Sequence, residues 1–156
     1  RCDIKSVSLL PNVLGKQMAR DAGAFEAWQV DQDGFITEGT STNAWIIDDD
    51  KRLITRQAGQ AILEGVTRRA ILDLAQTHGL EPVERAFTRD QALKAREAFV
   101  TSTTTFVLPV VRIDDEAVGD GRPGRFSRKL RQAYLAYMAG NRPFAAGEGP
   151  EESPEE

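Results

Sequence analysis

The sequence has few of the residues that disulfide, zinc or histidine chemistry requires. Cys2 is the only cysteine, so no internal disulfide can form, which fits a reducing compartment. His78 is the only histidine, and one cysteine with one histidine cannot make an ordinary zinc site. No hydroxyl or acid near His78 forms a recognised catalytic motif. Carboxylate metal sites remain open in principle, but we predict no metal.

Long apolar runs are also absent. None approaches the roughly 18 residues that a membrane-spanning helix needs. The opening residues, RCDIKS, do not have the charged-then-apolar pattern of a signal peptide. We therefore expect a cytoplasmic protein with no membrane partner. Because the first residue is Arg1 rather than Met, we also expect the chain to be part of a longer protein.

The negative charge is unevenly distributed. The net charge is −4, and residues 141–156 (NRPFAAGEGPEESPEE) carry all of it, with one Arg and five Glu. The remaining residues are neutral overall, which argues against nucleic acid as a partner. Their only basic cluster, 125–131 (RFSRKLR), is better explained as the solvated face of a helix. The Pro, Gly and Glu content of 141–156 predicts a disordered acidic tail after a single domain, 1–140.

Hydrophobic periodicity predicts a mixture of helices and strands without strict alternation. Helices are expected over 8–22, 66–78, 88–95 and 126–138. Strands are expected over 25–30, 35–37, 44–47, 53–55, 82–87, 98–102 and 106–113. Short strands joined by tight turns favour antiparallel or mixed sheets, so the expected fold class is α+β or mixed α/β.

Two polar segments place a reactive side chain beside apolar sequence. In 3–6 (DIKS), Lys5 precedes an apolar helix, and partial burial would lower its pKa and make its amine nucleophilic. The alternative is an ordinary surface lysine. In 37–43 (TEGTSTN), Glu38 stands at a strand end before a run of small hydroxyl residues. The alternative there is a polar hairpin loop.

Two further segments could bind an anion. In 63–68 (LEGVTR), a Gly-Val-Thr sequence opens a helix and offers N–H groups at the positive end of the helix dipole. It could equally be a plain helix cap. In 101–105 (TSTTT), five consecutive hydroxyl residues lie between two strands and could bind phosphate or carboxylate. The alternative is that threonine simply favours strands.

Taken in order, these four segments resemble the fold-type IV pyridoxal-phosphate enzymes. That family includes D-amino-acid transaminases, branched-chain aminotransferases and aminodeoxychorismate lyases. The resemblance runs from Arg1 to about Ala139, and RCDIKS followed by LLPNVLGKQMA is most similar to the D-amino-acid branch. It implies that residues 1–140 form the C-terminal, cofactor-binding domain of such an enzyme, without the N-terminal domain that precedes the lysine in full-length members.

The resemblance also implies a role for individual residues. Lys5 matches the lysine that binds the cofactor covalently and moves the proton, and Glu38 matches the acid that pairs with the pyridine nitrogen. The other matched residues line the cofactor or the substrate: Ser41 in the cofactor loop, Leu63 against the ring, Val66 and Thr67 at the phosphate-binding helix start, Ser102 and Thr103 on the second phosphate-side loop, and Thr104 near the substrate.

The activity implied is transamination between a D-amino acid of the D-alanine type and a 2-oxo acid such as 2-oxoglutarate. The cofactor is pyridoxal 5′-phosphate, and the full-length protein is expected to be a homodimer. One alternative is a branched-chain aminotransferase or aminodeoxychorismate lyase of the same fold. Another is a non-catalytic binding module or truncated fragment. The presence of both Lys5 and Glu38 favours catalysis, whereas the start at Arg1 favours the non-catalytic alternative.

Overall fold

The structure is a computed structural model that describes residues 1–140. The acidic stretch 141–156, which we expected to be disordered, lies outside the described residues. The described elements, in chain order, are α1 (Leu10–Asp21), β1 (Trp28–Val30), β2 (Phe35–Gly39), β3 (Asn43–Ile47), β4 (Arg52–Thr55), α2 (Val66–Thr77), β5 (Glu81–Glu84), β6 (Phe87–Thr88), α3 (Arg89–Leu93), β7 (Glu97–Ser102), β8 (Phe106–Val110), β9 (Arg112–Ile113), β10 (Glu116–Ala117) and α4 (Arg125–Met138).

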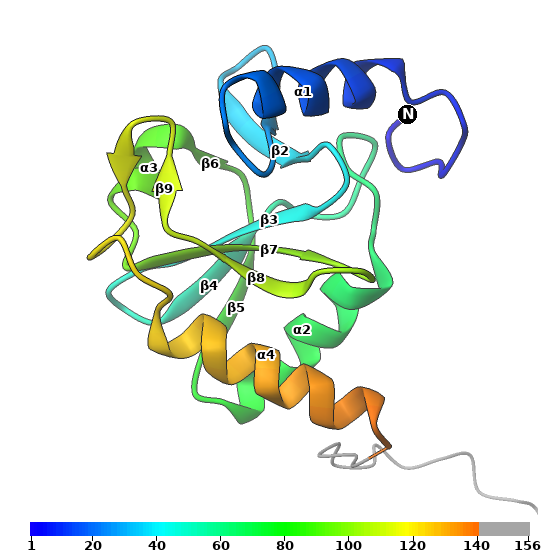
Figure 1. Cartoon of the computed structure of the whole chain (residues 1–156). Coiled ribbons are helices and arrows are strands. Elements are labelled where there is room, and N and C mark those ends of the chain that lie inside the picture. Colours follow the sequence, from blue (N-terminus) through cyan, green and yellow to red (C-terminus); the bar gives the residue numbers. More distant parts are fainter. Residues whose placement is uncertain (141–156) are drawn as a thin grey trace, which may run out of the picture.

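A five-stranded sheet in the order β5-β4-β3-β7-β8 forms the centre of the molecule (Figure 1). Only the β4–β5 pair of this sheet is parallel, and α2 is the crossover helix that such a pair requires. A smaller sheet, β1-β2-β6, lies beside it. The mixed α/β fold class predicted from the sequence is confirmed.

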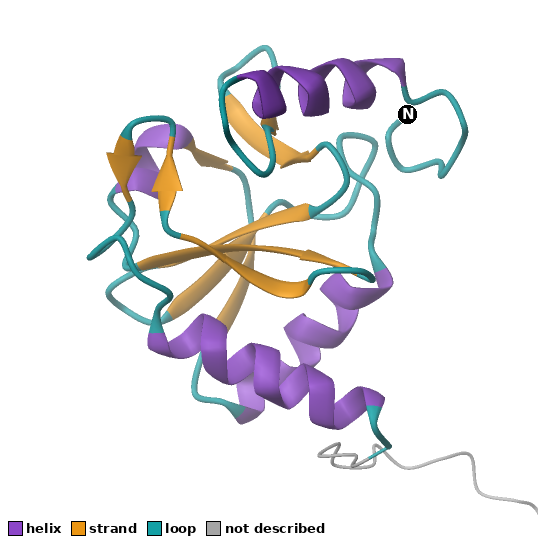
Figure 2. Cartoon of the chain, in the orientation of Figure 1, coloured by secondary structure: helices purple, strands orange, loops and turns teal. Residues whose placement is uncertain are grey.

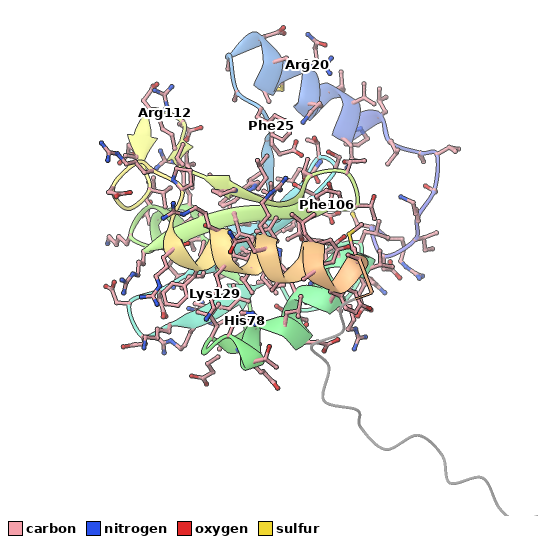
Figure 3. The ribbon with its side chains drawn as sticks, turned by 60° about the horizontal axis from the view of Figure 1, so that its bottom comes forward. Arg20, Phe25, His78, Phe106, Arg112 and Lys129 are labelled. Atoms are coloured by element: carbon pink, nitrogen blue, oxygen red, sulfur yellow. The ribbon has the colours of Figure 1, made fainter. Side chains whose placement is uncertain are left out.

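Both faces of the central sheet are covered, which explains why its inner strands are apolar throughout. Successive side chains of a strand point to opposite faces. Trp45 and Ile47 pack in the cluster that contains residues of α2 and α4, and these helices lie together on one side of the strands (Figures 2 and 3). Ile46 packs in the second cluster, with Ile36 of β2 and Phe87 of β6. Burial on both faces leaves little freedom to shift the register.

Two predicted strands are each divided in the structure. The strand expected over 82–87 becomes β5, which pairs with β4, and β6, which pairs with β2 in the smaller sheet. The strand expected over 106–113 becomes β8, which pairs with β7, and β9, which pairs with β10. The sequence predicted the extended conformation, but the choice of partner strand decided where each strand ends.

The α1 helix forms where its periodicity predicts, yet its apolar stripe faces outward. Leu10 is 67% exposed and Met18 is 71% exposed, and Ala19 is the buried residue of the helix. Periodicity therefore identified the helix but not its surroundings. Within residues 1–140, no helix is both long and apolar enough to cross a membrane.

The N-terminal end of α4 is held by a carboxylate from the sheet. Glu97 of β7 accepts hydrogen bonds from the backbone N–H groups of Phe126 (2.9 Å) and Ser127 (2.8 Å). A Cβ added to Gly124 would lie 1.9 Å from the Glu97 Cδ, so the chain must be glycine where the carboxylate approaches. A negative charge at a helix N-terminus is favourable. This contact fixes α4 against the sheet.

We expect Glu97→Ala to lower the free energy of unfolding by about 2–3 kcal/mol, because two buried N–H groups lose a charged acceptor. Urea denaturation measures the loss. Glu116→Ala is the control, since Glu116 forms an exposed ion pair with Arg89 and its removal should cost less than about 1 kcal/mol. Equal losses in the two variants would contradict this account of α4.

Candidate functional site

Glu38 is a buried acid at the end of β2. It is 8% exposed, and its Oε2 accepts a hydrogen bond from the backbone N–H of Leu63 at 3.0 Å. Burial raises its pKa to about 7, and the Leu63 N–H only partly offsets that effect. No basic side chain among residues 1–140 forms an ion pair with it. Glu38 can therefore gain or lose a proton near neutral pH.

The N-terminal end of α2 follows directly after Leu63. Gly65 is the N-cap, and no side chain within the described part of the chain caps this helix. Its first N–H groups have no partner inside the helix, so they offer a site for an anion. The Val66 side chain is 72% exposed. Thr67 is buried, and its hydroxyl lies 3.1 Å from that of Tyr134, so its side chain points to α4.

The hydroxyl residues 101–105 divide into structural and accessible members. Thr101 is buried and accepts a hydrogen bond from the Trp45 indole N–H at 2.9 Å. The Ser102 hydroxyl lies 2.8 Å from the Thr105 hydroxyl and accepts from the Thr105 backbone N–H, so it shapes the turn. Thr103 and Thr104 are exposed at the tip. Strand propensity thus explains Thr101 and Ser102, which belong to β7, but not the three residues of the turn, 103–105.

A second carboxylate, Glu26, organises the loop between β2 and β3. It accepts hydrogen bonds from the hydroxyls of Thr40, Ser41 (3.1 Å) and Thr42 (3.3 Å), and its side chain is 7% exposed. Burial alone would raise its pKa, but the Thr40 hydroxyl, the Ala27 N–H and other partners make the pKa lower than usual. Sequence reasoning missed Glu26 because its partners lie 14–16 residues away and no local pattern links them.

Lys5 does not contact these groups. Residues 1–10 are exposed, and Lys5 forms no hydrogen bond or ion pair with any of residues 1–140. Of the two interpretations given for Lys5, partial burial and a surface lysine, the structure shows the surface lysine. The segment is tied to the domain by a bond from the Cys2 N–H to the Gln60 carbonyl (2.8 Å), which leaves Lys5 outside the packed core.

The remaining predicted segments do meet, at one end of the central sheet. Asn43, the first residue of β3, lies opposite Thr101 in the strand register, and its side-chain amide donates to the Leu63 carbonyl at 2.9 Å. Glu38 is joined to the same Leu63. In Figure 1, the start of α2 lies beside the adjoining ends of β7 and β8. The acid, the helix N-terminus and the hydroxyl turn thus form one candidate site.

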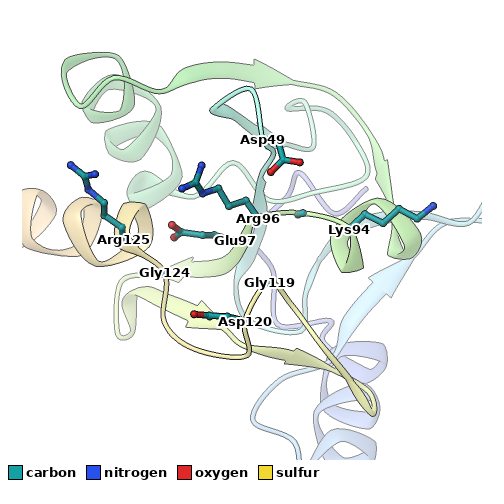
Figure 4. A pocket seen from close by; sticks show the side chains of 9 residues that line it. Asp49, Lys94, Arg96, Glu97, Gly119, Asp120, Gly124 and Arg125 are labelled. Carbon is teal, nitrogen blue, oxygen red and sulfur yellow. The ribbon is translucent and has the colours of Figure 1, made fainter.

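A surface pocket at the other end of the sheet is not a candidate (Figure 4). Glu97 lines it, and Glu97 pairs with Ile47, four residues and about 13 Å along β3 from Asn43. Its charged lining consists of three basic and three acidic residues: Lys94, Arg96, Arg125, Asp49, Glu97 and Asp120. This balance favours neither an anion nor a cation, and the Glu97 carboxylate already binds α4.

The two carboxylates of the site should affect stability in opposite ways. The folded chain holds the Glu38 proton up to a pKa of about 7, above the ordinary 4.5, so ionising Glu38 costs stability as the pH rises through this range. We expect Glu38→Gln to raise the free energy of unfolding by about 1–3 kcal/mol at about pH 8, with no gain below pH 4.5. Chemical denaturation across pH measures this.

Glu26→Gln is the control, because the Glu26 carboxylate is also buried but has a lowered pKa. Because the folded pKa of Glu26 is lowered, its ionised form contributes stability above the unfolded pKa, and that contribution is lost as the pH falls. Glu26→Gln should therefore destabilise the chain at neutral pH and have little effect in acid. The same sign for both variants at neutral pH would refute the environments assigned to the two acids.

Comparison with known proteins found a matching family model and proteins of similar sequence. The family model described as amino-transferase class IV matches residues 1–113. The D-alanine aminotransferase of Bacillus licheniformis is 44% identical over 133 residues, which cover 85% of this chain and 46% of that protein. The branched-chain-amino-acid aminotransferase of Pseudomonas aeruginosa is 39% identical over 129 residues, 83% of this chain and 41% of that protein.

A solved structure has the same fold. The branched-chain amino acid aminotransferase from Thermobaculum terrenum, in its PLP form, superposes with a TM-score of 0.85 at 30% identity. The match covers 90% of this chain and 46% of that one. The chain thus spans about half the length of the proteins that it matches.

Proposed function

The chain belongs to the class IV aminotransferases, and from this premise we propose that it forms the cofactor-binding part of a pyridoxal-phosphate-dependent aminotransferase. One observation carries the proposal: a buried acid with a pKa of about 7 is joined through Leu63 to a helix N-terminus that no side chain among residues 1–140 caps. An acid and an anion site linked in this way fit the pyridine nitrogen and the phosphate of one cofactor.

Each residue would have a defined task at this site. Pyridoxal phosphate supplies an electron sink when bound, and the protein supplies binding and orientation. Glu38 would hold a proton at the pyridine nitrogen, and the N–H groups at Val66 and Thr67 would bind the phosphate, with Ser102 and Thr103 on its other side. The remaining roles follow the family resemblance: Leu63 against the ring, Ser41 in the cofactor loop and Thr104 near the substrate.

Lys5 would hold the cofactor through its side-chain amine and, when that amine is free, would move a proton as general base. The structure leaves Lys5 exposed, so this role rests on its place in the family pattern rather than on a contact. The homodimer, the cytoplasmic location and the absence of nucleic-acid and membrane partners stay predictions.

We expect pyridoxal phosphate followed by borohydride reduction to label Lys5 in this chain, and peptide mapping by mass spectrometry identifies the site. Lys51 is the matched internal control, because it is equally exposed but lies in the turn between β3 and β4. Lys5→Ala should remove the label without moving it to Lys51. Equal labelling of Lys5 and Lys51 would show that exposure alone selects the lysine, and would contradict the proposed site.

For the substrate we propose a D-amino acid of the D-alanine type and a 2-oxo acid. The higher identity to a D-alanine aminotransferase than to a branched-chain enzyme supports this choice. The second candidate is branched-chain transamination, which the fold similarity to branched-chain enzymes supports. The aminodeoxychorismate lyase alternative stays a prediction.

Chiral chromatography of the glutamate formed from 2-oxoglutarate distinguishes the two candidates. With D-alanine as amino donor, we expect D-glutamate and pyruvate. Formation of L-glutamate from L-leucine, with none from D-alanine, would replace the D-amino-acid assignment with the branched-chain one. Neither product from a chain that carries the cofactor on Lys5 would instead support a non-catalytic binding module.

A further inference from the structure

Asn43 joins the two halves of the candidate site through one buried amide. The residue is 6% exposed, and its Nδ2 donates to the Leu63 carbonyl at 2.9 Å and to the Glu38 Oε2 at 3.5 Å. A side-chain amide has two N–H donors, so both bonds can form together. The Leu63 N–H donates to the same Glu38 oxygen at 3.0 Å. Asn43, Glu38 and Leu63 therefore form a closed ring of three hydrogen bonds.

The other end of the same amide fixes the start of α2. A Cβ added to Gly65, the N-cap of this helix, would lie only 2.5 Å from the Asn43 Oδ1. Gly65 has an ordinary extended backbone with φ −68°, so glycine is needed there for closeness rather than for conformation. The Asn43 Nδ2 thus binds the Glu38 carboxylate, and the Asn43 Oδ1 limits how closely the N-terminal end of α2 can approach Asn43.

The backbone of Asn43 is itself held firmly. It pairs with Thr101 across β3 and β7, and the four residues that follow it in β3 are buried and apolar. Supplying a partner for the Leu63 carbonyl would by itself justify a buried asparagine. That bond alone does not explain why the second N–H of the amide reaches Glu38, or why the amide oxygen lies close to the helix N-cap. The contacts of Asn43 converge on the two groups that the proposed function uses.

We propose that Asn43 is a positioning residue that fixes the separation between the Glu38 carboxylate and the N-terminal end of α2. The inference rests on the proposed function, because that spacing matters only if both groups bind one cofactor molecule. Binding groups must be held within about 0.5 Å of their productive positions by neighbours that are themselves locked. Asn43 is anchored by the sheet, so it can provide such support.

The test uses the full chain and measures two quantities: its affinity for the cofactor and the hydrogen-exchange rate of one backbone amide. We expect Asn43→Ala to weaken pyridoxal phosphate binding about three- to tenfold, the equivalent of one lost hydrogen bond. It should also speed hydrogen exchange at the Leu63 N–H, while the amides of Leu53 and Ile54 in the central sheet keep their protection. Glu38→Ala removes the acceptor of the Leu63 N–H, so it shows how much the exchange of this N–H speeds up when the hydrogen bond is lost completely.

Two further variants separate positioning from packing. Asn43→Asp keeps the side-chain shape but replaces the donor with a carboxylate beside Glu38, so it should weaken cofactor binding more than Asn43→Ala does. It also carries the test if Asn43→Ala does not fold. Asn12→Ala is the matched control, because the Asn12 amide donates to the Thr40 carbonyl at 2.9 Å and does not reach Glu38. It should change neither measurement.

In each chain, the hydrogen-exchange rate of the Leu63 N–H is compared with the rates of the Leu53 and Ile54 amides. The inference is overturned if this comparison gives the same result for Asn43→Asp as for the wild-type chain. It is also overturned if Asn12→Ala weakens cofactor binding as much as the Asn43 variants do. A wild-type chain that binds no pyridoxal phosphate would refute the proposed function for this chain. The exchange measurement would still decide whether Asn43 holds Glu38 and the helix in place, so the two failures can be told apart.

Discussion

The antiparallel pairing of β3 with β7 is the constraint on which both ends of the molecule depend. Its register places Asn43 opposite Thr101 and Ile47 opposite Glu97. At the Glu97 end, a carboxylate binds the N-terminus of α4 and fixes that helix against the sheet. At the Asn43 end, an amide joins Glu38 to the start of α2. A slip of one residue would turn every side chain of β3 to the wrong face and break both arrangements.

The pKa values of two buried carboxylates, Glu26 and Glu38, are shifted in opposite directions. Glu26 is surrounded by hydroxyl and backbone donors, which lower its pKa despite burial. Glu38 has few donors, so burial dominates and raises its pKa to about 7. The donors around Glu26 and the charge of Lys16, which lies 3.4 Å from its Oε1, favour the ionised form of Glu26, and Glu38 has no such cation among residues 1–140. This difference makes Glu26 suited to shaping the loop and Glu38 suited to chemistry.

Local patterns predicted the elements better than their surroundings. The helix expected over 88–95 forms as α3, which begins with a capping box of Thr88 and Gln91 whose two hydrogen bonds are both present. The periodicity of 8–22 predicted α1, but not that Leu10 and Met18 would face outward. The position of Lys5 before an apolar helix left both partial burial and a surface location open, and the structure shows it exposed. Local signals depend on a few neighbouring residues, whereas exposure depends on what the rest of the chain covers.

The sequence alone determined the helices and most strands, the mixed fold class, and the order of the polar segments that identify the class IV pattern. These features depend on side-chain periodicity, turn residues and spacing, all of which are written along the chain. Only the tertiary structure decided which segments meet. It brought Glu38, Leu63 and Asn43 into one ring, placed Glu26 beneath the loop at 40–42, and left Lys5 apart from them. Those contacts join residues far apart in sequence, and burial sets the pKa of each acid only once such contacts have formed.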